Sequence, residues 1–275
     1  MDKSILITGC STGIGYVCAH ALHKRGYQVV ASCRKIKDVE RLQAEGLTCI
    51  QLDLTDSQSI TKGVEQTLAL TNGKLDALFN NGAYGQPGAL EDLPTDGLRA
   101  QFETNFFGWH QLVCEILPGM RRQGYGRIVQ NSSVLGFAAM KYRGAYNASK
   151  FAIEGWSDTL RLELMDSDIH ISLIEPGPIE TEFRANALLA FKRWVTIEGS
   201  AHEENYRQQL QRLSNESSNN AFVLPAESCI EPLIHALEAK KPKIRYRVTT
   251  PTKVFAVLKR LLPSRVLDKI LRQAA

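Results

Sequence analysis

Several features that would assign this chain to a common functional class are missing from it. No apolar stretch reaches the roughly 18 residues of a membrane-spanning helix. The chain also does not begin with basic residues followed by a long apolar run, so a signal peptide is not expected. The six cysteines are scattered without a C-x-x-C pair, and no His/Cys cluster has the spacing of zinc ligands. We therefore expect a cytoplasmic protein with reduced thiols and no metal site.

A strong excess of one charge is also absent, because the net charge is only +4 over 275 residues. This value does not indicate nucleic-acid binding, so no nucleic-acid partner is expected. The charge is unevenly distributed, however, because residues 241–275 hold ten Lys or Arg and one Asp. An acidic partner or surface would therefore meet the C-terminal segment rather than the main body.

Short β-branched runs alternate with longer amphipathic stretches along most of the chain. Strands are expected at 4–8, 28–33, 48–52, 75–80, 127–132, 170–175 and 243–246, and helices at 14–24, 56–70, 96–122, 145–164 and 226–239. This alternation predicts an α/β fold with a doubly wound, mostly parallel, seven-stranded Rossmann-like sheet that has helices on both faces. Residues 1–275 are expected to form one domain, with 252–275 as basic amphipathic helices. Residues 181–224 are helix-prone and polar and end in the polar run 214–220, and they are expected to form a substrate-loop excursion.

A glycine-rich turn joins the first expected strand to the first expected helix. Its residues are Gly9, Ser11, Thr12, Gly13, Ile14 and Gly15. A helix start offers unpaired N–H groups and the positive end of the helix dipole, which suit a pyrophosphate, and glycines let the backbone approach it closely. The alternative is a purely structural glycine turn. A phosphate loop of the nucleotidase kind is excluded, because no Gly-Lys-Ser/Thr closes the turn.

The T-G-x-x-x-G-I-G spacing of this turn resembles that of the short-chain dehydrogenase/reductase family, and further motifs extend the resemblance over roughly residues 1–182. NAD-preferring sites usually end the second strand with Asp or Glu, which holds the ribose 2′-hydroxyl. The corresponding residue here is Arg34, which can pair with a 2′-phosphate instead. The predicted cofactor is therefore NADP(H), and the alternative is that Arg34 lies in a solvated basic turn.

Three further segments are expected to contact the cofactor. Asp53 and Leu54 follow the third strand, and in the family this aspartate touches the adenine amino group, although Asp53 could also cap the next helix. The family usually reads N-N-A-G after its fourth strand, whereas residues 80–83 read N-N-G-A, and Asn80 and Gly82 are the expected contacts. After the sixth strand, a segment resembling the family's nicotinamide-binding P-G-x-I/V-x-T contributes Pro176, Gly177, Ile179 and Thr181, unless it is a simple Pro-Gly turn.

A Tyr-x-x-x-Lys motif marks the expected catalytic residues. Tyr146 and Lys150 share one face of a helix, and a nearby ammonium should lower the phenol pKa. Ser133 lies thirteen residues upstream, which matches the family spacing, and it is expected to bind the substrate oxygen. Ser132 is the alternative, but neighbouring strand residues point to opposite faces. Asn105 matches the family asparagine that holds a water in the proton relay.

These residues together predict an oxidoreductase that transfers hydride between a nicotinamide and a carbonyl or alcohol. The expected pocket wall is mostly apolar, so the expected partner is a small apolar carbonyl or alcohol. Its expected members are Val134, Leu135, Phe137, Met140, Tyr142, Phe183, Leu188, Leu189, Phe191 and Trp194. Over the whole chain the sequence is similar to bacterial NADP-dependent aldehyde reductases related to retinol and 17β-hydroxysteroid dehydrogenases. That resemblance implies aliphatic aldehydes or retinal-like compounds.

Two functional alternatives stay open at this point. One is a non-catalytic NADP(H)-sensing module, and the other is an alcohol, retinol or steroid dehydrogenase that acts mainly in the oxidative direction. For the basic segment 252–275 we expect a lid or a subunit contact in a homo-oligomer. A helix pair on the membrane surface and a merely solvated terminal helix are the alternatives.

Overall fold

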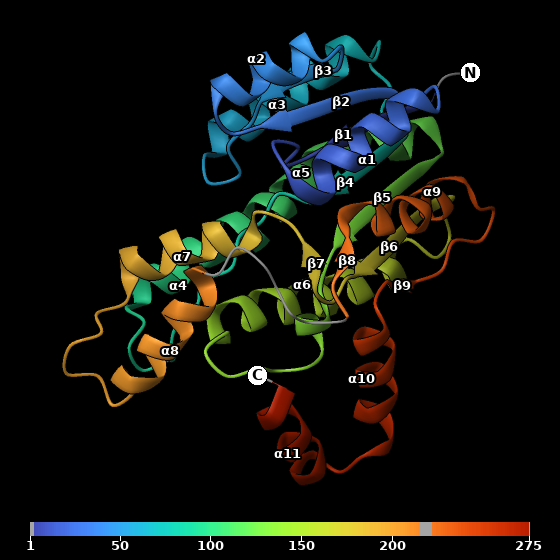
Figure 1. The fold of residues 1–275 in the computed structure, drawn as a ribbon. Coiled ribbons are helices and arrows are strands. Elements are labelled where there is room, and N and C mark those ends of the chain that lie inside the picture. Colours follow the sequence, from blue (N-terminus) through green and yellow to red (C-terminus); the bar gives the residue numbers. More distant parts are fainter. Residues whose placement is uncertain (1–2, 215–221, 275) are drawn as a thin grey trace.

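A seven-stranded sheet forms the centre of the computed structural model, which describes residues 3–214 and 222–274 (Figure 1). The strand order is β3-β2-β1-β4-β5-β6-β9, and every neighbouring pair is parallel. The strands are β1 (Ser4–Ile7), β2 (Gln28–Cys33), β3 (Thr48–Gln51), β4 (Ala77–Asn80), β5 (Gly126–Asn131), β6 (Ile169–Glu175) and β9 (Arg245–Arg247). The predicted doubly wound Rossmann-like sheet is confirmed.

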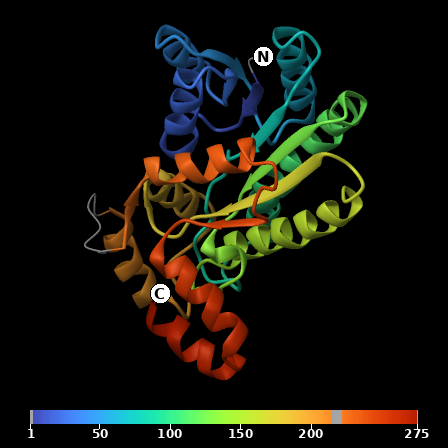
Figure 2. The same cartoon turned by 90° about the vertical axis from the view of Figure 1, so that its right-hand side faces the viewer.

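Apolar side chains of the strands alternate between two cores. Ile5 and Ile7 of β1 join one cluster, whereas Leu6 joins the other. The first cluster is covered by α1 (Gly13–Lys24), α2 (Ile36–Ala44) and α9 (Ile230–Glu238), and the second by α3 (Ser57–Leu70), α5 (Gly108–Gln123) and α6 (Gly144–Glu163). Helices therefore lie on both faces of the sheet (Figures 1 and 2). The strand order reverses between β1 and β4, and the crevice at such a reversal is the usual ligand site of this architecture.

The structure differs from the prediction at two helical segments. The short helix α2 was not expected, because five of its nine residues are polar or charged and only Val39 and Leu42 are buried. The expected helix 96–122 is divided into α4 (Thr95–Phe102), a π-helical turn at Glu103–Phe107 and α5. A π turn inserts extra backbone without disturbing the apolar pattern on either side, so periodicity could not reveal it.

The expected loop excursion 181–224 contains regular structure. The strands β7 (Ile179–Glu180) and β8 (Leu224–Pro225) form a small parallel sheet, and α7 (Phe183–Trp194) and α8 (Glu203–Ser214) lie between them. The helix-prone character of the segment therefore corresponds to two ordered helices, which bury an aromatic cluster around Tyr206. The polar run at 215–220 lies outside the described residues.

Two helices end the chain, α10 (Thr250–Leu261) and α11 (Ser264–Ala274). Thr249 caps α10, and Pro263 lies in the break between the two helices. They lie at the opposite end of the molecule from α2 and α3 in both ribbon views (Figures 1 and 2). Within the described ranges, no helix is both long and apolar enough to cross a bilayer.

A partly buried ion cluster joins β9 to the rest of the sheet. The Arg245 guanidinium contacts carboxylates of Glu154 at 2.9 Å, Asp158 at 2.8 Å and Glu175 at 3.2 Å. Arg247 contacts Glu175 at 3.1 Å. Burial, with Glu154 nearby, raises the pKa of Glu175 to about 7. Arg245 contacts both Glu154 and Glu175, and together with Arg247 it offsets these two closely spaced, poorly solvated carboxylates.

We expect Arg245→Met to lower the free energy of unfolding by about 3 kcal/mol at pH 8, because it removes the cation shared by Glu154 and Glu175 and leaves their negative charges less compensated. The Glu175 pKa is raised on folding, so its ionisation destabilises the native state above about pH 7, and this penalty fades toward its ordinary value of 4.5. The loss should therefore be smaller at pH 5.5, as measured by urea unfolding. An equal loss at both pH values would contradict this account. Arg99→Met, at an exposed ion pair, is the control.

Candidate active site

A cavity of about 730 Å³ opens at the C-terminal ends of β1, β4, β5 and β6. Most of the expected site residues line it, namely Gly9, Ser11, Thr12, Gly13, Ile14, Gly82, Ser133, Tyr146, Lys150, Pro176, Gly177, Ile179 and Thr181. The structure thus brings the glycine-rich turn, the Tyr-x-x-x-Lys helix and the Pro-Gly segment to one hollow. The other expected residues lie outside its lining, namely Gly15, Arg34, Asp53, Leu54, Asn80 and Asn105.

The glycine-rich turn requires its glycines for backbone reasons. Gly9 has φ +70°, and a Cβ atom there would lie 2.5 Å from the Gly82 Cα. A Cβ atom on Gly15 would lie 2.4 Å from the Gly9 carbonyl oxygen, so Gly15 lets α1 pack on the turn itself. Thr12 is the N-cap of α1, and its side chain makes no capping hydrogen bond. The first N–H groups of α1 are therefore left for a ligand in the cavity.

Asn81, which the sequence analysis did not select, joins three strand ends. Its Nδ2 atom donates to the carbonyl oxygens of Thr8 at 2.9 Å and Gly9 at 3.1 Å. Its Oδ1 atom accepts from Asn131 Nδ2 at 2.8 Å, and the Lys150 Nζ atom donates to the Asn131 carbonyl at 2.6 Å. A continuous set of hydrogen bonds therefore runs from the catalytic helix to the glycine-rich turn.

Asn80 and Asp53 have structural partners in the protein. Asn80 is fully buried, and its Nδ2 atom donates to the Trp109 carbonyl at 3.5 Å. The Asp53 carboxylate accepts from the Thr55 N–H at 2.9 Å and the Thr55 hydroxyl at 2.8 Å. The N-cap of α3 is Asp56, so the alternative of Asp53 as a helix cap is wrong. Leu54 packs beneath Gly82, where a Cβ atom would lie 3.0 Å from the Leu54 Cδ1.

Two arginines lie near the glycine-rich turn. Arg34 follows β2 and is exposed, and its carbonyl accepts from Gln51 Nε2 at 3.0 Å. Arg41 of α2 donates through Nη2 to the Ser11 carbonyl at 2.6 Å. Arg41 was not selected from the sequence, because the helix that carries it was not expected.

The two candidate serines follow β5 and have different partners. The Ser132 hydroxyl donates to the Glu154 carboxylate at 2.5 Å and is buried. The Ser133 Oγ atom accepts from the Leu135 N–H at 3.1 Å and lies close enough to Tyr146 for their hydrogen bond to lower the Tyr146 pKa. Ser133 is therefore the serine beside the phenol, whereas Ser132 anchors the segment to α6.

The pKa values of the two central groups depend on burial. Burial raises the pKa of Tyr146 to about 12, and the Ser133 hydrogen bond opposes this rise. Burial lowers the pKa of Lys150 to about 7, while the charge of Glu154 raises it. The expectation that the ammonium lowers the Tyr146 pKa is wrong for this structure. Lys150 is itself desolvated, with its Nζ 5.6 Å from the Tyr146 ring centroid and 4.4 Å from the Trp109 ring.

Asn105 lies in the π-helical turn and is completely buried. Its Nδ2 atom donates to the Tyr84 carbonyl at 2.9 Å and to Ser149 Oγ at 3.3 Å, and its Oδ1 atom accepts from the Tyr84 N–H at 3.2 Å. Asn105 therefore connects the backbone at Tyr84, in the segment after β4, to Ser149 of α6. Its role in a proton relay stays a prediction.

The rest of the cavity wall combines apolar side chains with the polar Arg143, Arg184 and Asn186. Four of the expected residues line it: Val134, Leu135, Met140 and Phe183. Phe183 packs edge-on against Tyr146 with ring centroids 5.3 Å apart. The remaining expected residues lie elsewhere: Phe137, Tyr142, Leu188, Leu189, Phe191 and Trp194. Phe222, Pro251 and Phe255 also line the cavity and were not expected, because nothing local in their sequence shows that the fold returns them to the site.

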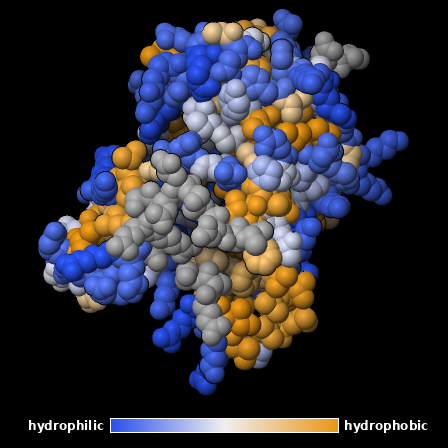
Figure 3. All heavy atoms as spheres, in the orientation of Figure 1, coloured by the Kyte–Doolittle hydropathy of each residue, from blue (hydrophilic) through white to orange (hydrophobic). Residues whose placement is uncertain are grey.

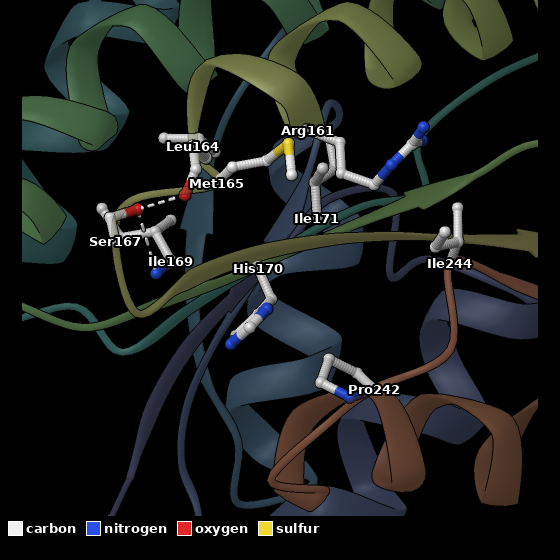
Figure 4. Close-up of a pocket in the computed structure, with 9 residues that line it drawn as sticks. All are labelled: Arg161, Leu164, Met165, Ser167, Ile169, His170, Ile171, Pro242 and Ile244. Carbon is white, nitrogen blue, oxygen red and sulfur yellow. Dashed lines mark hydrogen bonds between the residues drawn. The ribbon is translucent and has the colours of Figure 1, made fainter.

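A second, smaller cavity of about 210 Å³ lies where β6 begins, at the other end of this strand (Figure 4). Its lining includes Arg161, Met165 and His170 but none of the expected site residues. Its Ser167 hydroxyl is already used by the Leu164 carbonyl at 2.8 Å and the Ile169 N–H at 3.4 Å. Across the described part of the chain, no group of three or more His, Cys, Asp or Glu could hold a metal ion.

Comparisons with known proteins agree with this arrangement. The sequence profile of the short chain dehydrogenase family matches residues 3–190. The uncharacterized oxidoreductase YbbO of Escherichia coli (strain K12) is 43% identical over 272 residues, which cover 99% of this chain and 95% of that protein. Human retinol dehydrogenase 8 is 35% identical over 254 residues, which cover 88% of this chain and 80% of that protein. The crystal structure of a short-chain dehydrogenase from Streptomyces avermitilis has a TM-score of 0.78, with 28% identity, and covers 94% of this chain and 92% of that one.

The buried Lys150 leads to a prediction about stability. Its pKa falls on folding from 10.5 to about 7, so below pH 7 the charged, desolvated lysine destabilises the native state in full. Lys150→Met should therefore be more stable than the natural protein by about 2 kcal/mol at pH 6, after allowing for the lost bond to Asn131. This advantage should shrink as the pH rises toward 10.

Thermal or urea unfolding at several pH values checks this prediction. Lys62→Met, which removes an exposed lysine from α3, serves as the control and should show no such pH dependence. A stability difference for Lys150→Met that stays constant or grows with pH would rule out the burial effect.

Proposed function

The chain belongs to the short-chain dehydrogenase family of oxidoreductases, and on that premise we propose that it is an NADP(H)-dependent reductase of apolar aldehydes or ketones. The observation that carries the proposal is the position of Ser133 and Tyr146 in one cavity. This cavity has an uncapped helix start on one side and an apolar wall on the other. Such a site suits an anionic dinucleotide beside an apolar substrate.

In the proposed reaction, Ser133 and Tyr146 bind the carbonyl oxygen of the substrate, and Tyr146 donates the proton to it. A nicotinamide supplies the hydride when it is bound. With a pKa of about 12, the Tyr146 hydroxyl is protonated near neutral pH, as a proton donor must be. Lys150, held by the Asn131 carbonyl, is the proposed contact of the nicotinamide ribose and the proton relay partner of Asn105.

The residues present fit a dinucleotide. The proposed phosphate site is the start of α1, because its first-turn N–H groups have no side-chain cap, and Gly9 and Gly13 keep the approach free of Cβ atoms. On the adenosine side, Arg34 is the proposed partner of a 2′-phosphate, and Asp53, Leu54, Asn80 and Gly82 are further proposed contacts. The proposed nicotinamide contacts are Pro176, Gly177, Ile179 and Thr181.

The proposed substrate class follows from the wall of the cavity. Met140, Phe183, Phe222 and Phe255 offer apolar contacts, so a medium or long aliphatic or retinal-like carbonyl is favoured. The similarity to human retinol dehydrogenase 8 agrees with this class. A cytoplasmic location and assembly into a homo-oligomer belong to the same proposal.

The first test replaces the proposed proton donor. Tyr146→Phe should lower kcat by at least about 100-fold with a panel of apolar aldehydes, while NADPH affinity stays nearly unchanged, because only the hydroxyl is lost. The measurement combines steady-state NADPH consumption with a fluorescence titration of NADPH. A variant that keeps more than about a tenth of kcat would refute the role of Tyr146. A natural protein that binds NADPH but reduces nothing would favour the sensing module.

The two serines give a matched pair for the same assay. Ser133→Ala should be severely impaired in turnover, because it removes a hydrogen-bond donor to the substrate oxygen. Ser132→Ala should be affected much less in turnover and mainly in stability, since its hydroxyl is bonded to Glu154. The reverse order would mean that the wrong serine has been assigned.

The cofactor preference is tested at Arg34. Arg34→Ala should weaken NADPH binding by about 10- to 150-fold and leave NADH binding nearly unchanged, because a charge-assisted bond to a phosphate is worth roughly 1.5–3 kcal/mol. Lys62→Ala removes an equal charge from α3 and should change neither affinity. Equal losses for both cofactors would refute a contact between Arg34 and the 2′-phosphate.

A further inference from the structure

The C-terminal helices present an apolar face to the outside. On α10, Val254, Val257 and Leu261 lie at positions i, i+3 and i+7, with exposed fractions of 47%, 53% and 73%. Val266 of the neighbouring helix α11 is also exposed, at 44%. The space-filling view shows an extended hydrophobic surface over these two helices, at the lower right (Figure 3). We call these four residues the C-terminal apolar face.

This face is not the side by which the helices pack on the body. Leu271 of α11, together with Phe255 and Leu267, packs against Val134 and Ala138 beside the active site. The Lys259 Nζ atom adds a hydrogen bond to the Phe137 carbonyl at 2.5 Å. The helices are therefore already held by their inner sides, and the C-terminal apolar face is left toward solvent.

The helices that carry this face are strongly basic. Apart from Lys259, whose ammonium contacts the body, the exposed side chains of α10 and α11 include Lys253, Arg260, Arg265, Lys269 and Arg272, with Asp268 as the one acidic residue among those described. The rest of the protein has the opposite balance, because residues 1–240 hold 23 Lys or Arg against 28 Asp or Glu. An anionic surface would therefore attract this end of the molecule and repel the other end, which fixes the orientation.

The same helix also reaches the active-site cavity. Pro251 and Phe255 of α10 line the cavity, whereas Val254 and Val257 lie on the outer side of that helix. The C-terminal apolar face is thus separated from the cavity by the thickness of one helix. A compound dissolved in a bilayer that contacts this face would have a short path to the cavity.

We propose that α10 and α11 dock the protein on the surface of an anionic lipid bilayer, with the C-terminal apolar face inserted at the level of the headgroups. An amphipathic helix with basic flanks binds such surfaces through apolar burial and attraction to anionic headgroups. A second copy of this chain fits less well, because a two-fold contact through this face would bring like charges together. Docking on the membrane does not depend on the proposed reaction. Only the delivery of apolar substrates from the bilayer rests on the proposed function.

Sedimentation of the full chain with vesicles tests the proposal without any turnover. Vesicles of phosphatidylcholine with 30% phosphatidylglycerol should bind the protein, whereas pure phosphatidylcholine should bind it at least about tenfold more weakly. Binding to the anionic vesicles should fall as salt rises from 50 to 500 mM. No sedimentation with anionic vesicles at low salt would overturn the proposal.

Two double variants separate this face from general apolar exposure. Val257→Asp with Leu261→Asp should reduce binding to the anionic vesicles by at least about tenfold. Leu162 and Met165, near the end of α6, have exposed fractions of 61% and 72%. The double variant Leu162→Asp with Met165→Asp should leave binding unchanged. NADPH consumption with a water-soluble short aldehyde should be the same in both, which shows that the cavity is intact.

Light scattering after gel filtration identifies the competing occupant. The proposal expects the same molar mass for the natural chain and for the Val257→Asp, Leu261→Asp variant. If the variant has a smaller assembly and the natural chain does not sediment with vesicles, the face is a contact between copies and the proposal is wrong. Loss of vesicle binding in the α6 variant as well would also contradict it, since the effect would then not be specific to this face.

Discussion

The hydrogen bond from the Lys150 Nζ atom to the Asn131 carbonyl joins the two halves of the site. Asn131 in turn donates to Asn81, whose amide holds the carbonyls of Thr8 and Gly9. One set of side chains thus fixes the ends of three parallel strands relative to α6. Gly9 and Gly15 have no side chains that could anchor the glycine-rich turn, so the position of the turn depends on these hydrogen bonds.

This arrangement requires ionisable groups to be buried. Burial raises the pKa of Tyr146 and Glu175 and lowers that of Lys150, which favours the neutral form of each side chain. Groups perturbed in this way usually cluster where a protein performs chemistry, and their cost is offset by the packing of two well-filled cores. Arg245 keeps the carboxylates behind the site compensated, so the edge strand β9 also contributes to the geometry of the site.

The sequence predicted the sheet and most of the cavity lining because both depend on local patterns, namely buried β-branched runs and fixed motif spacings. It did not indicate α2, in which only Val39 and Leu42 are buried. Asn81 and Phe255 could not be selected, since their importance comes from contacts between distant segments. The direction of the Tyr146 pKa shift was also wrong, because motif spacing gives the neighbours of a residue but not its depth.

The central claim is that this cavity transfers hydride to an apolar carbonyl while Tyr146 supplies the proton. Mass spectrometry after incubation with NADPH carrying two deuterium atoms at C4 of the nicotinamide tests it directly. The account predicts an alcohol product with one deuterium on its carbinol carbon, formed by the natural protein and not by Tyr146→Phe. Product without deuterium, or labelled product formed equally by both proteins, would contradict it.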